Sequence, residues 1–324
     1  MRYTFIDTAR GIAILLVVLG HCFSSAECGM NKLILSFHMP LFFFLSGIFA
    51  KPLAFNQLWG GVKHKVRLLL IPQLILSLSL IVLNGGLWLA DGNSIKNFDI
   101  VSCFFYWFLL VLFSCAVLFM IVSSITDLKR WITRVVIFLT ISFCIVLSFR
   151  ITIAPVLYWV RIIPTAFLFY FAGFLLKDRV LDNKSEHTSW EGLKVLFLTA
   201  TLFVLSQVNA PVKMYENEYG HYSLFLLTSV FGIYIVISLA KLMQSAPLLE
   251  EMGRISIAIY TWNFLIIGVV YRLTNRLLVS IEWVDKGIIT GITFGFSLLL
   301  LYIFSKFTYN RMPFLHGIKQ KKKS

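Results

Sequence analysis

Ten long apolar runs, separated by short polar segments, fill the sequence. They cover residues 10–27, 33–50, 68–89, 100–122, 135–149, 162–176, 193–209, 223–240, 255–271 and 287–305. An apolar helix of about 20 residues is long enough to cross the hydrocarbon core of a bilayer. The pattern predicts an all-α polytopic membrane protein with about ten transmembrane helices. The fifth and sixth runs are the shortest, and we expect the segment between them, 150–161, to dip or tilt.

The composition supports the same class. Hydrophobic residues make up 59% of the 324 residues and charged residues 14%, whereas a soluble domain carries about 25% charged residues. The longest connection, 177–194, is a short charged loop, and there is no internal repeat. We therefore expect a single transmembrane domain over residues 1–324, without an appended soluble domain.

The distribution of positive charge predicts the orientation. A net charge of +14 is compatible with nucleic-acid binding, but no nucleic-acid motif accompanies it, and basic cytoplasmic loops explain it more simply. With the N-terminus inside, the outer segments hold only eight of the 29 lysines and arginines: Lys32, Lys96, Arg150, Arg161, Lys213, Arg272, Arg276 and Lys286. Both termini are therefore predicted to be cytoplasmic. A cleaved signal peptide ending near Ala26 is the alternative for the first run, and His21 and Asp7 argue against it.

The first apolar run carries two ionisable residues on one helical face. Arg10 and His21 are eleven residues apart, which is about three helical turns and about 16 Å along the axis. Arg10 would then lie at one membrane interface and His21 within the hydrocarbon. An ionisable group at that depth indicates a functional site. A histidine whose hydrogen bonds are satisfied between packed helices is the alternative.

A second histidine is expected at a similar depth. The second run enters from the outer side, so His38 lies about 8 Å below that surface, and His21 approaches the same surface from the opposite direction. Pro40 removes a backbone hydrogen bond and can open a bend beside His38, freeing a carbonyl. Gly47 is expected to allow a close helix contact.

Basic residues gather on the inner side before the third run. Lys63, His64, Lys65 and Arg67 could join Arg10 as a cationic mouth for a phosphorylated ligand, or they could simply be a positive-inside flank. No glycine-rich phosphate loop, carboxylate pair or metal-ligand spacing occurs. We therefore expect no metal and no bound cofactor. The five cysteines are interpreted as buried thiols, with a Cys28–Cys103 disulfide as a minor alternative.

Several of these segments together resemble the membrane-bound acyltransferase-3 family, and in particular its fucose 4-O-acetylase-like branch. The matching pieces are residues 7–12 with His21, 37–47, 67–72, 106–109, 169–173 and 252–256 with Tyr260. The resemblance implies O-acylation, usually acetylation, of an extracytoplasmic or lipid-linked carbohydrate by cytoplasmic acetyl-CoA, in a bacterial-type inner membrane. It also implies that His21 is catalytic and that Arg10 binds the donor.

Two positions depart from the family pattern. The paired arginines before the third run appear here only as His64 and Arg67, and Asn263 stands where relatives often carry a histidine.

From the residues themselves we assign roles as hypotheses. His21 is the general base, and His38 orients it or stabilises the oxyanion. Asp7 orients Arg10. The family resemblance implies that Tyr260 and Asn263 are supporting residues. A transporter or flippase of a glycolipid or small anion is the alternative function, and a catalytically inactive scaffold is a third. The outer tyrosines Tyr215, Tyr219 and Tyr222, with His221, could contact a sugar or simply lie at the membrane interface.

Overall fold

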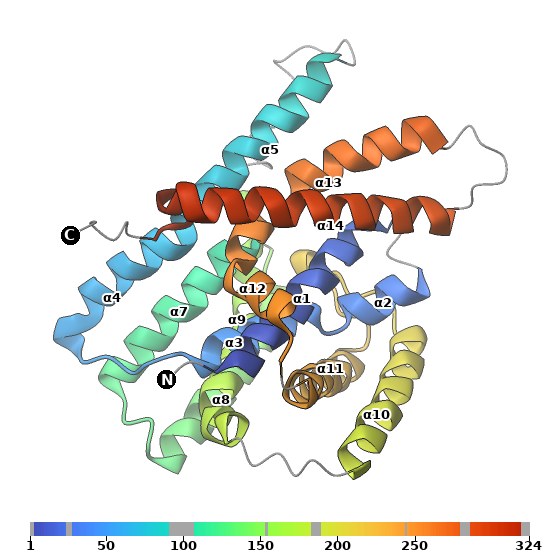
Figure 1. Ribbon diagram of the computed structural model, residues 1–324. Coiled ribbons are helices and arrows are strands. Elements are labelled where there is room, and N and C mark those ends of the chain that lie inside the picture. Colours follow the sequence, from blue (N-terminus) through green and yellow to red (C-terminus); the bar gives the residue numbers. More distant parts are fainter. Residues whose placement is uncertain are drawn as a thin grey trace.

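Helices account for nearly all of the described chain in the computed structural model (Figure 1). The structure describes residues 3–23, 28–90, 107–152, 155–182, 189–243, 245–278 and 286–318. In these ranges the only β-type pairing is an isolated bridge between Lys213 and Glu218.

The helices follow one another in a simple order. The first half of the chain contains α1 (Thr4–Cys22), α2 (Gly29–Leu35), α3 (His38–Ile48), η1 (Phe55–Gln57), α4 (Leu58–Lys65), η2 (Val66–Leu70), α5 (Ile71–Ala90), α7 (Trp107–Ile125) and α8 (Trp131–Arg150). The second half contains η4 (Pro155–Ile162), α9 (Ile163–Leu181), α10 (Ser189–Val208), η5 (Met214–Glu216), α11 (Tyr222–Leu242), α12 (Pro247–Arg254), α13 (Ser256–Leu278), α14 (Lys286–Arg311) and η6 (Pro313–His316).

The described helices include ten that are long and apolar enough to cross a membrane, which confirms the predicted fold class. Each predicted run overlaps one of them, with ends that differ by several residues. The expectation of short fifth and sixth spans is wrong, because these have 20 and 25 residues. Much of the segment between them forms the 3-10 helix η4 (Pro155–Ile162), and the expected dip or tilt stays a prediction.

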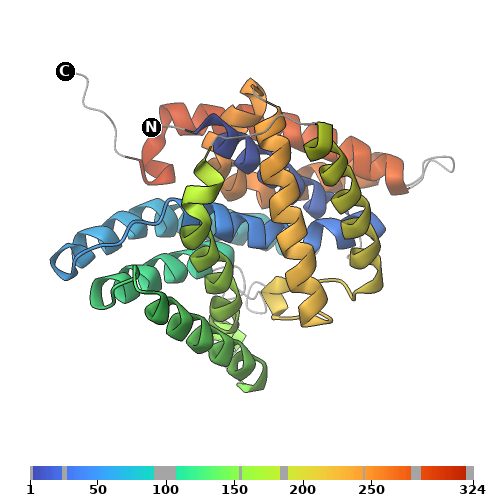
Figure 2. The same ribbon diagram turned by 90° about the horizontal axis from the view of Figure 1, so that it is seen from below.

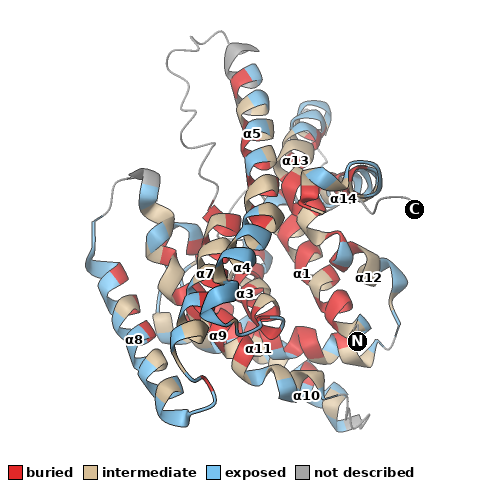
Figure 3. Ribbon diagram, turned by 90° about the vertical axis from the view of Figure 1, so that its left-hand side faces the viewer, coloured by how far each residue is buried: buried red, intermediate tan, exposed pale blue. Residues whose placement is uncertain are grey.

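The first two spans form the centre of the bundle. In the most apolar 18-residue stretch of the second span, 72% of the residues are buried. In the corresponding stretches of α8 and α10 only 17% are buried. Figures 2 and 3 show the same arrangement, with α1 and α3 inside and α8 and α10 at the periphery. The exposed faces of these outer helices are apolar, as expected for surfaces that face lipid.

Glycines let the central helices meet backbone to backbone. A side chain at Gly253 of α12 would collide with the backbone oxygen of Asp7 in α1, and one at Gly11 would collide with the backbone of Leu249. The predicted close contact at Gly47 is confirmed, because that residue lies against the backbone of Tyr170 in α9. Small residues allow such approach in membrane helices.

The third span is a long helix that contains one wider turn. Residues Val66–Leu70 form the π-helix η2 between α4 and α5. The whole helix from Phe55 to Leu83 has 29 residues, about 44 Å at the usual rise, and the hydrocarbon core is only about 30 Å thick. Because α4 has no buried residue, we infer that its beginning extends beyond the hydrocarbon.

The C-terminal turn packs against this π-helix. Gly317, whose φ is 69°, lies against the backbone of Arg67. The preceding His316 is buried and bonds Thr308 through Nε2 at 3.1 Å, and burial lowers the pKa of His316 to about 4. The histidine is therefore neutral at physiological pH, which avoids the cost of burying a charge.

An ion pair holds α14 against α12. Lys306 Nζ lies 2.9 Å from the carboxylate of Glu251, and the Tyr302 hydroxyl donates to the same carboxylate. The hydrogen bond from Tyr302, followed by that from Lys306, lowers the pKa of Glu251.

The cysteines carry free thiols where they are described. Cys22 and Cys115 are buried, Cys144 is half-buried and Cys28 is exposed. Cys103, the other half of the suggested disulfide, lies outside the described residues.

Candidate active site

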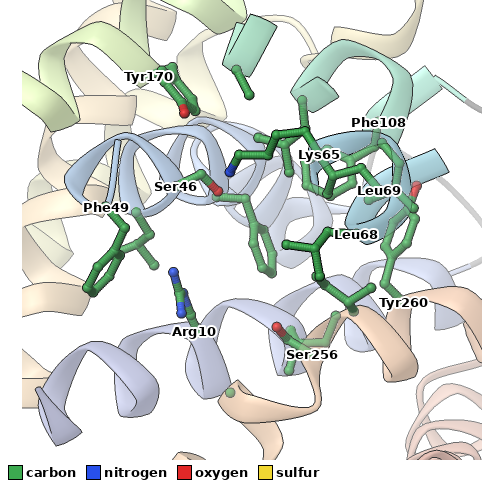
Figure 4. Close-up of a pocket in the computed structure, with 18 of the residues that line it drawn as sticks. Arg10, Ser46, Phe49, Lys65, Leu68, Leu69, Phe108, Tyr170, Ser256 and Tyr260 are labelled. Carbon is green, nitrogen blue, oxygen red and sulfur yellow. The ribbon is translucent and has the colours of Figure 1, made fainter. Parts of the chain in front are cut away.

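A cavity of about 250 Å³ lies between α1, α3, α7, α9, α13 and the α4–η2 helix (Figure 4). Its polar lining residues are Arg10, Ser46, Lys65, Tyr170, Arg254, Ser256 and Tyr260. The rest of the wall is mainly leucine, isoleucine and phenylalanine. The cavity therefore combines an apolar wall with a few polar groups, as ligand sites do.

Three cations reach this cavity, and no carboxylate is among the described residues that line it. Arg10 points into it from α1 and Lys65 from the end of α4 (Figure 4). The guanidinium of Arg10 lies 4.9 Å from the centre of the Phe49 ring, and its charge acts on Lys65. Like charges repel each other, so two cations that line one cavity favour an anionic ligand that neutralises both.

Asp7 supports Arg10 from the preceding turn of α1. Its side chain is buried, at 8% exposure, and its charge acts on the Arg10 guanidinium. The orienting role expected for Asp7 stays a prediction.

The other predicted donor-site residues do not line the cavity. Lys63 is exposed and lies over the ring of Trp59 at 5.1 Å. His64 is also exposed, and its Nδ1 lies 3.5 Å from a guanidinium nitrogen of Arg67. Arg254 was not among the predicted site residues. It reaches the cavity because α12 folds back against α1, a contact that no local pattern reveals.

His21 lies in the last turn of α1, which ends one residue later at Cys22. This is nearer the end of the helix than the predicted run to residue 27 implied. The His21 ring lies 4.4 Å from that of Phe264 in α13, and its side chain is exposed. His21 also interacts electrostatically with His38, which lies at the start of α3.

His38 is positioned by a break in the second span. Helix α2 ends at Leu35 and α3 begins at His38, so the interruption lies beside His38, where the bend was expected. Pro40 cannot donate to the carbonyl of Ser36, and Ser229 Oγ donates to that carbonyl instead, at 3.0 Å. The break also leaves the carbonyl of Ile34 available to the His38 ring.

The bond to Ile34 sets the tautomer of His38. Its Nδ1 lies 2.8 Å from the Ile34 carbonyl oxygen, which can only accept, so Nδ1 carries the hydrogen. In the neutral ring Nε2 then carries the lone pair and can accept a hydrogen bond. This geometry favours orientation of His21 over donation to an oxyanion as the role of His38.

Helix α13 supplies buried polar groups between the cavity and His21. Within the described chain, the Tyr260 hydroxyl and both carboxamide atoms of Asn263 are buried without a hydrogen-bond partner. Tyr260 lines the cavity, and Asn263 immediately precedes Phe264, which contacts His21. Unpaired buried polar atoms cost stability, so a ligand or water that pairs with them is favoured here.

The outer-loop tyrosines mostly serve packing. Tyr219 is buried and bonds Asn217, and Tyr222 lies 3.3 Å from the Thr165 hydroxyl. Of the three, Tyr215 is exposed. These contacts favour a structural role for the loop over a sugar site.

The side chains fit acid–base chemistry with an anionic ligand. Among the described residues no group of three His, Cys, Asp or Glu side chains comes together to hold a metal ion. What converges is a cation-lined cavity at one end of α1 and a pair of histidines at the other.

A comparison with protein families gives one match. Residues 3–306 match the acyltransferase-3 family model, which is described as an acyltransferase domain. No curated protein and no solved structure matches the chain.

Proposed function

The chain belongs to the acyltransferase-3 family, and on that premise we propose that it moves an acetyl group from acetyl-CoA to a carbohydrate hydroxyl. It is a multi-pass membrane enzyme of the acyltransferase class. The proposal adds acetyl-CoA as the donor and an extracytoplasmic or lipid-linked sugar as the acceptor. It also assigns the residues that bind the donor and carry out the transfer. It also adds the orientation, with both termini in the cytoplasm of a bacterial-type inner membrane.

One observation carries the proposal: Arg10, which lines the cavity, and His21 lie on the same helix, with His21 in its last turn. Arg10 lines the cavity, and His21 is eleven residues further along α1, about 16 Å away along the axis. An extended pantetheine arm can span such a distance, so a donor held by its phosphates at Arg10 can present its thioester near His21.

The cavity is too small for the entire donor. Pockets for drug-sized ligands measure about 300–1,000 Å³, and this one measures about 250 Å³. We place part of the donor inside, with its phosphates against Arg10, Lys65 and Arg254. The nucleotide end stays outside, where Lys63 and His64 are exposed on the same helix as Lys65.

The transfer step follows from His21 as a general base. The neutral ring takes the proton of the sugar hydroxyl while that oxygen attacks the thioester carbonyl carbon. A carbon–oxygen bond forms, the carbon–sulfur bond breaks, and the histidine returns the proton to the departing CoA thiolate. His38 orients His21 through its Nε2, and Tyr260 and Asn263 supply the polar support that the buried thioester requires.

Family membership favours this proposal over the transporter alternative. An exposed His21 also leaves the ring accessible to an acceptor, which the base mechanism needs.

The test is His21→Gln in membranes supplied with acetyl-CoA. Glutamine can hydrogen-bond but cannot take a proton, and a general base contributes about 10²–10⁴ in rate. We expect acetyl transfer to membrane carbohydrate, measured by mass spectrometry of surface glycans, to fall by at least the lower factor. Acetyl-CoA binding should remain, because the donor is held at the other end of α1.

The matched control is His221→Gln, since His221 is an exposed histidine that does not line the cavity. Its acetylation should equal that of the wild type. Undiminished transfer in His21→Gln would remove the base assignment, and absence of any acetyl transfer by the wild type would reject acetyl as the group moved.

A further inference from the structure

Three aromatic rings close one end of the cavity. Phe42 from α3, Phe108 from α7 and Tyr260 from α13 all line it. The Phe108 ring lies 5.7 Å from that of Phe42 and 5.0 Å from that of Tyr260. We call these three residues the aromatic partition. In Figure 4, Phe108 and Tyr260 lie at the opposite side of the cavity from Arg10 and Phe49.

The partition faces the histidines. On α3 and α13 its member is the lining residue nearest to them in the sequence, because His38 precedes Phe42 by four residues and Phe264 follows Tyr260 by four. Four residues are about one helical turn, or 6 Å. Phe264 in turn contacts the ring of His21. The partition therefore separates the cationic cavity from the histidine pair.

The partition is firmly supported from behind. Phe43 is fully buried, and its ring lies 5.4 Å from that of Phe108. Phe108 and Tyr260 are each 5% exposed. Rings whose centres lie 5.0 and 5.7 Å apart are in contact with each other, so a group that moves between them toward His21 has to displace one of them.

We propose that the aromatic partition selects the acyl group by size and admits short acyl thioesters such as acetyl. This inference rests on the proposed function, because it concerns the route of the donor's thioester. Each added methylene must be accommodated between packed rings, and such a difference in a tight apolar site is worth about 10- to 200-fold in discrimination. The buried Tyr260 hydroxyl, which has no partner among the described residues, is placed to bond the thioester carbonyl as it passes.

Size selection by the rings and bonding of the thioester carbonyl by the Tyr260 hydroxyl can be tested separately. Phe108 contributes only bulk, so its removal should change size selection. Tyr260 contributes both a ring and a hydroxyl, so Tyr260→Phe should lower turnover and leave the size selection intact.

The experiment uses inverted membrane vesicles from cells that make the full-length protein with its native acceptor. The vesicles receive radiolabelled acetyl-CoA, propionyl-CoA or butyryl-CoA, and label transferred to membrane carbohydrate is measured. For Phe108→Ala we expect the ratio of butyryl to acetyl transfer to rise at least 10-fold over the wild type. Tyr260→Phe should keep the wild-type ratio while acetyl transfer slows.

Phe113→Ala is the matched control, since Phe113 is a partly buried phenylalanine on the same helix that does not line the cavity. It should leave the ratio unchanged. If Phe108→Ala does not accumulate as folded protein, Phe108→Leu keeps an apolar side chain without the ring and should shift the ratio in the same direction.

The outcomes separate the two proposals. Wild-type acetyl transfer combined with an unchanged ratio in both Phe108 variants overturns the partition and leaves the proposed function standing. An equal change of ratio in Phe113→Ala also overturns it, because general loosening of α7 would then be the cause. No transfer from any of the three donors by the wild type refutes the proposed function itself.

Discussion

Arg10 interacts with three residues in and around the cavity. Its guanidinium lies over Phe49, Asp7 acts on it from the preceding turn, and its charge acts on Lys65. A guanidinium presents two parallel N–H groups to a phosphate, which an ammonium cannot do. The arrangement makes Arg10 the residue whose loss should weaken donor binding most directly.

We expect Arg10→Ala to weaken acetyl-CoA binding by about 10- to 100-fold, because hydrogen bonds to charged groups contribute about 1.5–3 kcal/mol. Arg10→Lys should recover only part of the loss. The affinity of each variant for acetyl-CoA is measured by calorimetry on the purified protein in detergent. Lys129→Ala, which removes an exposed cation away from the cavity, should bind as the wild type does. If all of these proteins bind acetyl-CoA with equal affinity, Arg10 does not hold the donor and contributes only to the orientation of the chain in the membrane.

At this scale the sequence reveals part of the site. The eleven-residue spacing predicts that Arg10 and His21 share a helix, and the row of basic residues before the third span includes Lys65. It does not show which of those residues faces inward, because that depends on the π-turn that begins right after Lys65. Arg254 and the pairing of His38 with Ile34 depend on a helix contact and a helix break that local periodicity does not encode.

At the scale of elements, Pro40 in the second span leaves a carbonyl unbonded, and a neighbouring helix uses that carbonyl. Pro40 lies in the first turn of α3, where a missing N–H costs little. The carbonyl of Ser36 that it leaves unbonded is used by Ser229 of α11. The prediction of a freed carbonyl beside His38 is therefore confirmed, and the break itself holds α3 to a neighbouring helix.

The contact between α1 and α12 gives a prediction for elements. In Gly253→Ala the new methyl group would meet the backbone of Asp7 and of Gly11, and backbone atoms cannot move aside. Overpacking of this kind costs about 1–3 kcal/mol. We expect a lower melting temperature in detergent and weaker acetyl-CoA binding, since Arg254 and Arg10 both depend on this contact.

Gly192→Ala provides the comparison, because nothing lies within 4 Å of a side chain added there. Alanine is favoured over glycine inside a helix by about 0.5–1 kcal/mol, so this variant should be as stable as the wild type or slightly more stable. If Gly253→Ala has the same melting temperature as the wild type, then α12 and α1 are not packed as closely as described.

At the scale of the whole molecule, the positive charges predict the orientation. In the predicted topology 21 of the 29 lysines and arginines lie on one side. Reporter fusions after Ser124, Ser185 and Ser324 should therefore report the cytoplasm, and fusions near Asn93 and Asn217 the opposite side. Alkaline phosphatase and green fluorescent protein are suitable reporters, because each is active on only one side. A C-terminus found outside would place the cationic cavity away from cytoplasmic acetyl-CoA and would contradict the proposed donor.

The central position of α1 has a consequence for how the protein is made. The ribosome completes about 240 residues between Gly11 and Gly253, and at about 5–20 residues per second this takes on the order of 10–50 s. Throughout that interval the first helix, with Asp7, Arg10 and His21, lacks α12 and α13. Polar side chains alone in lipid are costly, so the insertion machinery has to shelter the helix that is synthesised first until the segments that complete its surroundings emerge.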